Sequence, residues 1–166
     1  MQKKEKNNIA RLAASPFRLK LFMLRYLPIG LITGLKVVSF DEKEVRVTVP
    51  YKYWNKNPFR SIYFAVLAMA AELSTAMAGL AASEDAGVPV SMLVLGMRSE
   101  FTKKAKTRIT FRCTEGEQMR QAVAKSIETG EGQIVEVSAT GTDTAGDEVA
   151  KFWLTWTFKP KSLKRS

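Results

Sequence analysis

The chain has 166 residues, 46% of them hydrophobic, a net charge of +10, one cysteine and no histidine. This length and composition fit one folded domain with a sizeable core. The absence of histidine excludes Ser-His-Asp and Cys-His catalysis and His-based metal sites, so any general base must be a carboxylate. The single cysteine, Cys113, excludes an internal disulfide and a cysteine-clustered zinc site, and it favours a reducing, cytoplasmic compartment. Its residue pattern is typical of a small buried apolar side chain.

The positive charge is concentrated in three segments. Residues 1–25 hold seven basic residues and one acidic, residues 98–112 hold six and one, and residues 159–166 hold four basic residues. Such clustering fits a polyanionic partner, whether a phosphorylated ligand, a nucleic acid or an anionic membrane. For the two chain ends we favour simple solvation. The chain has no Gly-rich RNA motif, zinc finger or helix-turn-helix signal, so we expect no nucleic-acid partner.

The first predicted element is a helix over residues 17–27, which begins after Ser15-Pro16 and ends at Pro28. Its apolar stripe consists of Leu19, Phe22, Met23 and Tyr26. Two arginines lie on the opposite side of the helix. Two interpretations are open at this point, because such a helix can lie on a membrane surface or pack across a sheet edge.

Alternating apolar residues predict strands beyond this helix. The expected strands span residues 35–40, 45–49, 90–101, 107–113, 134–142 and 148–158. Helical spacing predicts a short helix over 117–127, and an aromatic loop at 51–59 leads into a long helix. The predicted order is therefore helix, two strands, long helix, and four strands with a short helix inserted.

The long helix is predicted over residues 61–83, which are apolar or small apart from Glu72 near the middle. A segment this uniform is typical of a helix buried on every side. A carboxylate there is costly unless it is protonated, hydrogen-bonded or used in chemistry. A structural glutamate that holds a group inside the core is one alternative. A membrane span is another, but a central carboxylate costs about 2.5 kcal/mol or more there, and we expect no stable membrane insertion.

An antiparallel sheet joined by hairpins needs a cover for its apolar face, and only the helix at 61–83 is long and apolar enough. Its eight alanines allow strands to approach closely. We therefore expect an α+β fold in which an antiparallel sheet wraps around one long central helix, with a helix before it. The expected organisation is a single domain over 1–166, with a basic arm and helix at 1–30, a core at 31–158 and a basic tail at 159–166.

Several residues around the start of the long helix follow a recognisable spacing. They are Asn57, Arg60, Tyr63-Phe64-Ala65 and Glu72. This register resembles the hotdog-fold acyl-CoA thioesterase superfamily, in particular its phenylacetyl-CoA and 4-hydroxybenzoyl-CoA thioesterase-like groups. The pattern of that family is Asn, two residues, Gly, two residues, His-Gly-Gly, and an Asp or Glu on the following helix. The resemblance implies a hotdog fold and covers roughly residues 30–158.

The resemblance implies a catalytic role for three residues. Glu72 would act on a thioester as general base or nucleophile, the backbone N–H of Phe64 would polarise the carbonyl oxygen, and Asn57 would position water or the carboxylate. The N-terminus of a helix suits that task because its free N–H groups stabilise developing negative charge. The implied function is an acyl-CoA thioesterase that hydrolyses an acyl- or aryl-acyl-CoA. Coenzyme A enters as part of the substrate, and neither a cofactor nor a metal is expected.

The chain departs from the family pattern at the loop before the helix. Arg60 replaces a glycine, Tyr63 the histidine, and Phe64-Ala65 the glycine pair. Bulk at a place where a thioester must approach the backbone favours an alternative function, a non-catalytic hotdog protein that binds an acyl-CoA or fatty-acyl ligand.

The candidate substrate-binding residues are Arg60, Ser61, Tyr63, Ser91, Lys103 and Lys104. The two lysines lie where the resemblance implies contact with coenzyme A phosphates, but a solvated hairpin tip explains them equally well. Arg60 similarly fits an anion clamp or a solvent-exposed side chain. The resemblance also implies a homodimer, or a tetramer of paired dimers, with the site at the interface. The sequence leaves open which subunit supplies Asn57 and which supplies Glu72.

Overall fold

The computed structural model describes residues 8–161, and the outer parts of the predicted basic arm and tail lie outside this range. The helices are α1 (Asn8–Ala13), α2 (Pro16–Tyr26), α3 (Pro28–Thr33), α4 (Phe64–Asp85) and α5 (Gly116–Thr129), with a 3-10 turn η1 at Tyr53–Asn55. The strands are β1 (Lys36–Phe40), β2 (Val45–Val49), β3 (Val90–Phe101), β4 (Ile109–Cys113), β5 (Gln133–Thr142) and β6 (Glu148–Pro160).

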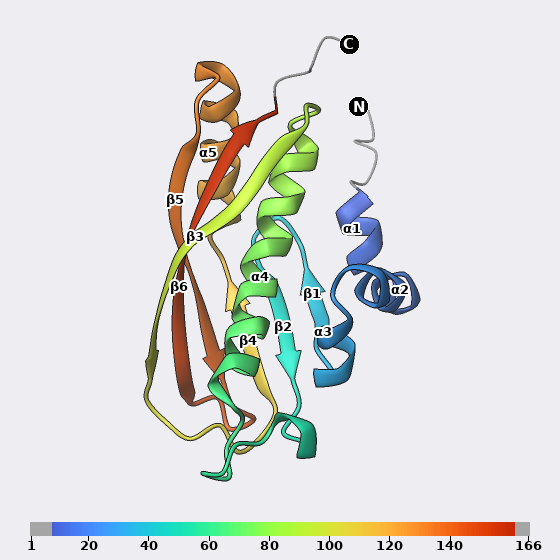
Figure 1. Ribbon diagram of the computed structural model, residues 1–166, viewed down its shortest axis with the longest axis vertical. Helices are drawn as coiled ribbons and strands as arrows, with labels where there is room; N and C mark the ends of the chain where they lie inside the picture. The colour runs from blue at the N-terminus through green and yellow to red at the C-terminus, as the bar shows by residue number, and fades with distance from the viewer. Residues whose placement is uncertain (1–7, 162–166) are drawn as a thin grey trace.

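The six strands form one antiparallel sheet in the order β1-β2-β4-β5-β6-β3. The sheet curves around α4, which packs against β2 to β6 (Figure 1). This arrangement confirms the predicted α+β fold with one central helix. Strands β1 and β3 are the two edges of the sheet.

The core lies between α4 and the concave face of the sheet, where alternating strand residues point inward. The strand residues with almost no exposed surface include Val45, Val47, Val49, Ile109, Phe111, Phe152, Leu154 and Phe158. Small residues of α4 allow a close approach to these strands. At Gly79, a Cβ atom would lie 2.7 Å from the terminal methyl of Met92, so even an alanine there would displace that side chain.

Helix α4 differs from the prediction in two ways. It begins at Phe64 rather than Ser61, because the residues just before it are held in a hydrogen-bonded loop. It is also not buried on every side, since Ala65, Ala68 and Glu72 form a half-buried stripe. Among residues 8–161, α4 is the one helix long and apolar enough to cross a bilayer, and 61% of its apolar window is buried inside the protein. It therefore packs as a core helix.

The predicted N-terminal helix is α2, and it lies beyond β1 together with α1 and α3 (Figure 1). The Ser15 hydroxyl caps α2 by accepting the N–H of Arg18 at 3.4 Å. Leu19 and Met23 are buried against the core, as the apolar stripe predicted, whereas Tyr26 is largely exposed. The Glu84 carboxylate anchors α1 to the end of α4 by accepting two N–H groups of the first turn of α1, at 3.1 and 3.0 Å.

Gly141 is a position where the core leaves no room for a side chain. It pairs with Phe111 across β4 and β5, and a Cβ atom would lie 2.6 Å from the buried Phe111 ring. We expect Gly141→Ala to lower the free energy of unfolding by about 1–3 kcal/mol, because overpacking forces the ring from its place. Urea unfolding measures this loss. Gly96→Ala, on β3 with nothing within 4 Å of the new Cβ, is the matched control, and equal losses in both variants would contradict the prediction.

Candidate active site

The loop that leads into α4 is organised by Asn57. Its Oδ1 accepts the N–H of Phe59 at 3.0 Å and both the N–H and the hydroxyl of Ser61 at 3.2 Å. Its Nδ2 donates to the carbonyl of Ile62 at 3.5 Å. The Asn57 carboxamide is thus bonded within its own loop, and its role toward a water or the Glu72 carboxylate stays a prediction.

Arg60 has φ +59°, in the left-handed region that favours glycine. This is the position at which the resembling family has a glycine, the residue that adopts this conformation most readily. The Arg60 carbonyl accepts the hydroxyl of Tyr51 at 3.0 Å. The side chain is exposed and does not line the cleft described below, so its bulk leaves the cleft open.

Asn55 fixes the start of α4, and the sequence analysis missed it. It is fully buried, and its Nδ2 donates to the carbonyls of Thr33 and Pro50, both at 2.8 Å. Its own carbonyl accepts the N–H of Tyr63 at 2.7 Å. Asn55 therefore joins α3 to the end of β2 through its side chain, and holds the residue before α4 through its backbone carbonyl.

The first turn of α4 presents free donors. Tyr63 is the N-cap residue and provides no side-chain cap. Within residues 8–161, neither the N–H of Phe64 nor that of Ala65 has a hydrogen-bond acceptor. Orphan N–H groups and the helix dipole make this end of α4 a place where negative charge is stabilised.

A cleft of about 600 Å³ opens at this helix start, between the loop before α4 and the connection after β3. It brings together six of the predicted site residues: Asn57, Ser61, Tyr63, Phe64, Lys103 and Lys104. The side chains of Leu67 and Phe101 provide apolar walls. The cleft therefore combines apolar surface with helix N–H groups and two lysines at its rim.

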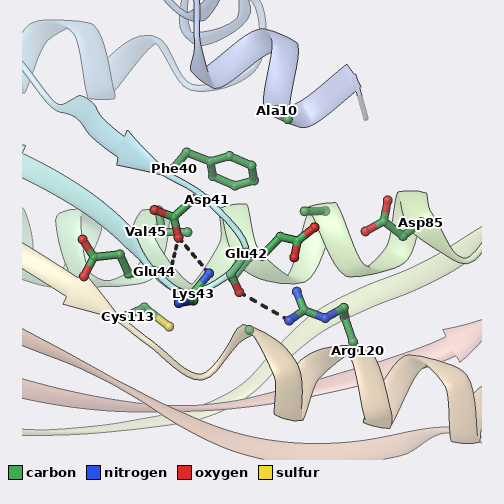
Figure 2. Close-up of a pocket in the computed structure, with 13 residues that line it drawn as sticks. Ala10, Phe40, Asp41, Glu42, Lys43, Glu44, Val45, Asp85, Cys113 and Arg120 are labelled. Atoms are coloured by element: carbon green, nitrogen blue, oxygen red, sulfur yellow. Dashed lines mark hydrogen bonds between the residues drawn. The ribbon is translucent and has the colours of Figure 1, made fainter. Parts of the chain in front are cut away.

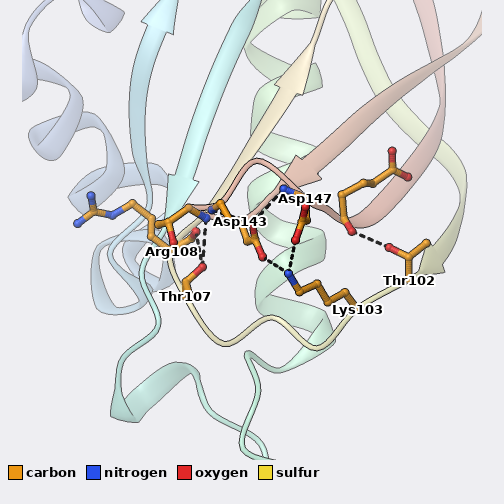
Figure 3. A network of polar contacts seen from close by, with 9 residues as sticks. Thr102, Lys103, Thr107, Arg108, Asp143 and Asp147 are labelled. Atoms are coloured by element: carbon orange, nitrogen blue, oxygen red, sulfur yellow. Dashed lines mark hydrogen bonds and ion pairs between the residues drawn. The ribbon is translucent and has the colours of Figure 1, made fainter.

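The two lysines differ in their availability to an anion. Lys103 Nζ pairs with Asp143 Oδ2 at 2.7 Å and with Asp147 Oδ2 at 2.6 Å, in the turn between β5 and β6 (Figure 3). The hydrogen bond to Asp143, and then that to Asp147, raise the pKa of Lys103. These carboxylates compete with any phosphate. Lys104 is exposed and has no ion pair within residues 8–161, so it is the better candidate for an anionic group.

Glu72 lies on the half-buried stripe of α4, and burial raises the pKa of its carboxyl. No hydrogen bond or ion pair reaches the carboxylate from residues 8–161, so no group in that range supports the alternative of a structural glutamate. Glu72 follows Phe64 by eight residues, which is about 12 Å along the helix axis. Within one chain, Glu72 does not line the cleft.

Ser91 is also remote from the cleft. It lies near the start of β3, ten residues before Phe101, which is about 33 Å along the strand. One chain therefore does not bring Ser91 to the other candidate residues.

A second pocket, of about 210 Å³, lies at the other end of α4, between the turn after β1 and the start of α5 (Figure 2). Its polar groups are largely engaged: Asp41 Oδ1 accepts two N–H groups of the turn at 2.7 and 2.9 Å, and Arg120 bonds Glu117 at 2.9 Å and the Glu42 carbonyl at 3.3 Å. Burial raises the pKa of Cys113 to about 11, which keeps this thiol protonated. In residues 8–161, no group of three or more His, Cys, Asp or Glu residues is placed to hold a metal ion.

The curved antiparallel sheet around one central helix defines a hotdog-fold protein, and solved structures agree in fold. A probable thioesterase from Pseudomonas aeruginosa is 20% identical, with a TM-score of 0.71 over 89% of this chain and 97% of that one. A thioesterase from Haemophilus influenzae is 14% identical, with a TM-score of 0.64 over 92% and 95%. A Chlorobaculum tepidum protein of unknown function is 16% identical, with a TM-score of 0.75 over 90% and 99%. At these identities the likeness shows the fold.

A family model described as a domain of unknown function, DUF4442, matches residues 18–158, and the chain belongs to this family. The match covers β1 to β5 and β6 as far as Phe158, and it includes the cleft and Glu72. A comparison with curated protein sequences gave no match.

Proposed function

We propose that the protein is a thioesterase that hydrolyses an acyl- or aryl-acyl-CoA. The observation that carries this proposal is the start of α4, where the N–H of Phe64 has no acceptor within residues 8–161 and Phe64 lines an apolar cleft. The same helix bears the Glu72 carboxylate, which has no partner in that range. The Phe64 N–H would bind the thioester carbonyl oxygen, and Glu72 would act on the carbonyl side as base or nucleophile.

As a base, Glu72 takes a proton from water while the water oxygen attacks the carbonyl carbon. The tetrahedral oxyanion is held by the Phe64 N–H. The intermediate then breaks its C–S bond, and the proton on Glu72 passes to the departing sulfur. The products are a carboxylic acid and free coenzyme A, so no metal, oxidant or further cofactor is needed.

A homodimer would bring these two groups to one carbonyl. They lie about 12 Å apart along α4, which is too far for both to reach the same thioester in one chain. In an isologous dimer, two antiparallel copies of α4 related by a two-fold axis near Ala68 place Phe64 opposite Glu72 of the partner subunit. Ala65 and Ala68 are small and half-buried, so they permit a close approach. We therefore propose two equivalent sites per dimer.

The edge strand β3 supports the same assembly. It has no neighbour on one side within the sheet and carries the exposed side chains of Leu93 and Leu95. An exposed apolar edge of this length is a template for pairing with another strand. Pairing of two β3 strands would join the sheets of two subunits edge to edge.

The substrate class follows from the cleft. Its apolar walls suit an acyl or aryl group, and the cation of Lys104 at the rim suits a phosphate of coenzyme A. The half-exposed ring of Phe64 also lines the cleft, and this bulk favours the alternative of a protein that binds acyl-CoA without hydrolysing it.

The test is thiol release from short, medium, long and aromatic acyl-CoAs, with the melting temperature measured in the presence of each. We expect release above the protein-free rate for at least one chain class. A rise in melting temperature with the acyl-CoA recovered intact would support the non-catalytic alternative. Background release together with unchanged melting temperatures would overturn both functions.

A further inference from the structure

Helix α2 is apolar on two opposite faces. Its inner face buries Leu19 and Met23, which are 6% and 1% exposed. Its outer face carries Phe17, Leu21 and Leu24, which are 77%, 59% and 62% exposed. These three residues follow one another at spacings of four and three, so they form one continuous face of the helix. An amphipathic helix that only covers a sheet edge needs the inner face alone.

The adjoining helix also exposes apolar side chains. Helix α3 packs against α2 and exposes Ile29 and Ile32. Both helices lie outside β1, whereas β3 is the opposite edge of the sheet (Figure 1). The surface is therefore separate from the strand edge at which we propose that two subunits pair.

The charges around the outer face all have one sign. Residues 6–40 contain no Asp or Glu. At 100° per residue, Arg18 and Arg25 flank the face on one side and Lys20 flanks it on the other. These three side chains make no ion pair within residues 8–161. The outer face is an apolar strip between two basic margins.

We propose that α2 is a peripheral binding site for an anionic lipid bilayer. Phe17, Leu21 and Leu24 enter the boundary between headgroups and acyl chains, and the flanking basic side chains meet anionic headgroups. This role is independent of the thioesterase function. The helix lies in the plane of the bilayer, in agreement with the expectation of no stable insertion.

The charge and the apolar content of the outer face favour an anionic bilayer over other partners. A second copy of the chain seated through the same face would oppose basic margins of equal sign. A nucleic acid would contact the basic side chains but would leave the three exposed apolar side chains of this face without a partner. An anionic bilayer uses both features, because apolar burial and attraction to anionic headgroups contribute together.

Vesicle flotation with the full chain tests the proposal. We expect binding to vesicles of phosphatidylcholine mixed with phosphatidylserine, and binding weaker by at least about tenfold to phosphatidylcholine alone. The double change Leu21→Ser and Leu24→Ser should weaken binding to the mixed vesicles by at least about tenfold. Arg18→Gln with Arg25→Gln should do the same. Ile134→Ser and Lys159→Gln, exposed on other parts of the sheet, are the apolar and charged controls and should bind like the wild type.

A site-specific label reports the depth of insertion without depending on affinity. The one native thiol, Cys113, is buried, so Leu21→Cys can be labelled selectively with a polarity-sensitive fluorophore. We expect a blue shift and brighter emission on adding mixed vesicles, and no change for the same label on Ile134→Cys. Equal melting temperatures establish that the variants fold.

Three outcomes would overturn the proposal. The first is absence of binding to mixed vesicles. The second is unchanged vesicle binding after Leu21 and Leu24 are replaced, or a change in emission from the label at position 134 and not from the label at position 21. The third is binding to a nucleic acid or an acidic protein in place of vesicles. Such binding would be salt-dependent and would need only the basic side chains.

Discussion

Glu72→Gln will lower the rate of thiol release from the best acyl-CoA by about 10²–10⁴-fold, because the amide neither accepts a proton nor attacks a carbonyl. The KM should stay within about threefold, since the change leaves the cleft and its N–H groups intact. Glu128→Gln, at an exposed position of α5, is the matched control and should retain the full rate. An unchanged rate in Glu72→Gln would remove this carboxylate from the mechanism.

The melting temperature of Glu72→Gln shows whether this variant folds. Because burial raises the pKa of Glu72, the folded protein binds a proton there more tightly than the unfolded chain does. This contribution to stability is complete below the ordinary carboxyl pKa of about 4.3 and is lost as the pH rises through the raised value. Glu72→Gln should therefore melt at a higher temperature than the wild type near neutral pH and lose that advantage at acid pH.

The pH dependence of catalysis follows from the same shift. A base must be deprotonated in the free enzyme, so kcat/KM should rise with pH through the raised pKa of Glu72. The rise is expected above the range of an ordinary carboxyl group. A rise at the ordinary carboxyl pKa would assign the titration to an exposed carboxylate instead.

Most of the fold was predictable because its signals are local. The period-two alternation of β2, β4 and β6 reflects one buried face, and the apolar run of α4 with its central Glu72 favoured a core helix over a membrane span. Helices α1 and α3 were missed because six residues are too few to show a helical period. The position of α1 depends on contacts with α2 and α4, and that of α3 on contacts with α2 and η1, none of which a short segment encodes.

The site was predictable only in part, because its polar contacts span long distances in sequence. Asn55 bonds to Thr33, 22 residues away, and Lys103 to Asp143, 40 residues away. Neither pairing leaves a pattern in the chain. The left-handed backbone at Arg60 lies at the position where the resembling family has a glycine. The resemblance marked this position, although an arginine by itself does not suggest a left-handed backbone. The spacing of residues in the sequence indicated the loop and the helix start that form the site. The hydrogen-bond and ion-pair partners of each side chain could be identified only from the structure.

Phe64→Pro will remove the proposed carbonyl donor without disrupting α4. Proline is tolerated at the first position of a helix, where the N–H has no intrahelical acceptor. Tyr63 has φ −62° and ψ 134°, the conformation that a residue before proline adopts. We expect kcat to fall by about 10²–10³-fold, the effect of losing one oxyanion donor. Phe64→Ala keeps the N–H and is the matched control. It should retain activity, and equal losses in the two variants would assign the effect to the ring.

Mixing the two inactive chains tests whether the site is shared between subunits. A mixed dimer of Phe64→Pro and Glu72→Gln chains has one site with both changes and one site with an intact N–H and an intact carboxylate. Refolding the chains together in equal amounts makes about half of the dimers mixed, so about a quarter of the wild-type rate should return. If both groups served a carbonyl within one chain, every site would keep one defect and the mixture would stay inactive. Recovery thus requires that the helix start of one subunit and the carboxylate of the other act on the same thioester.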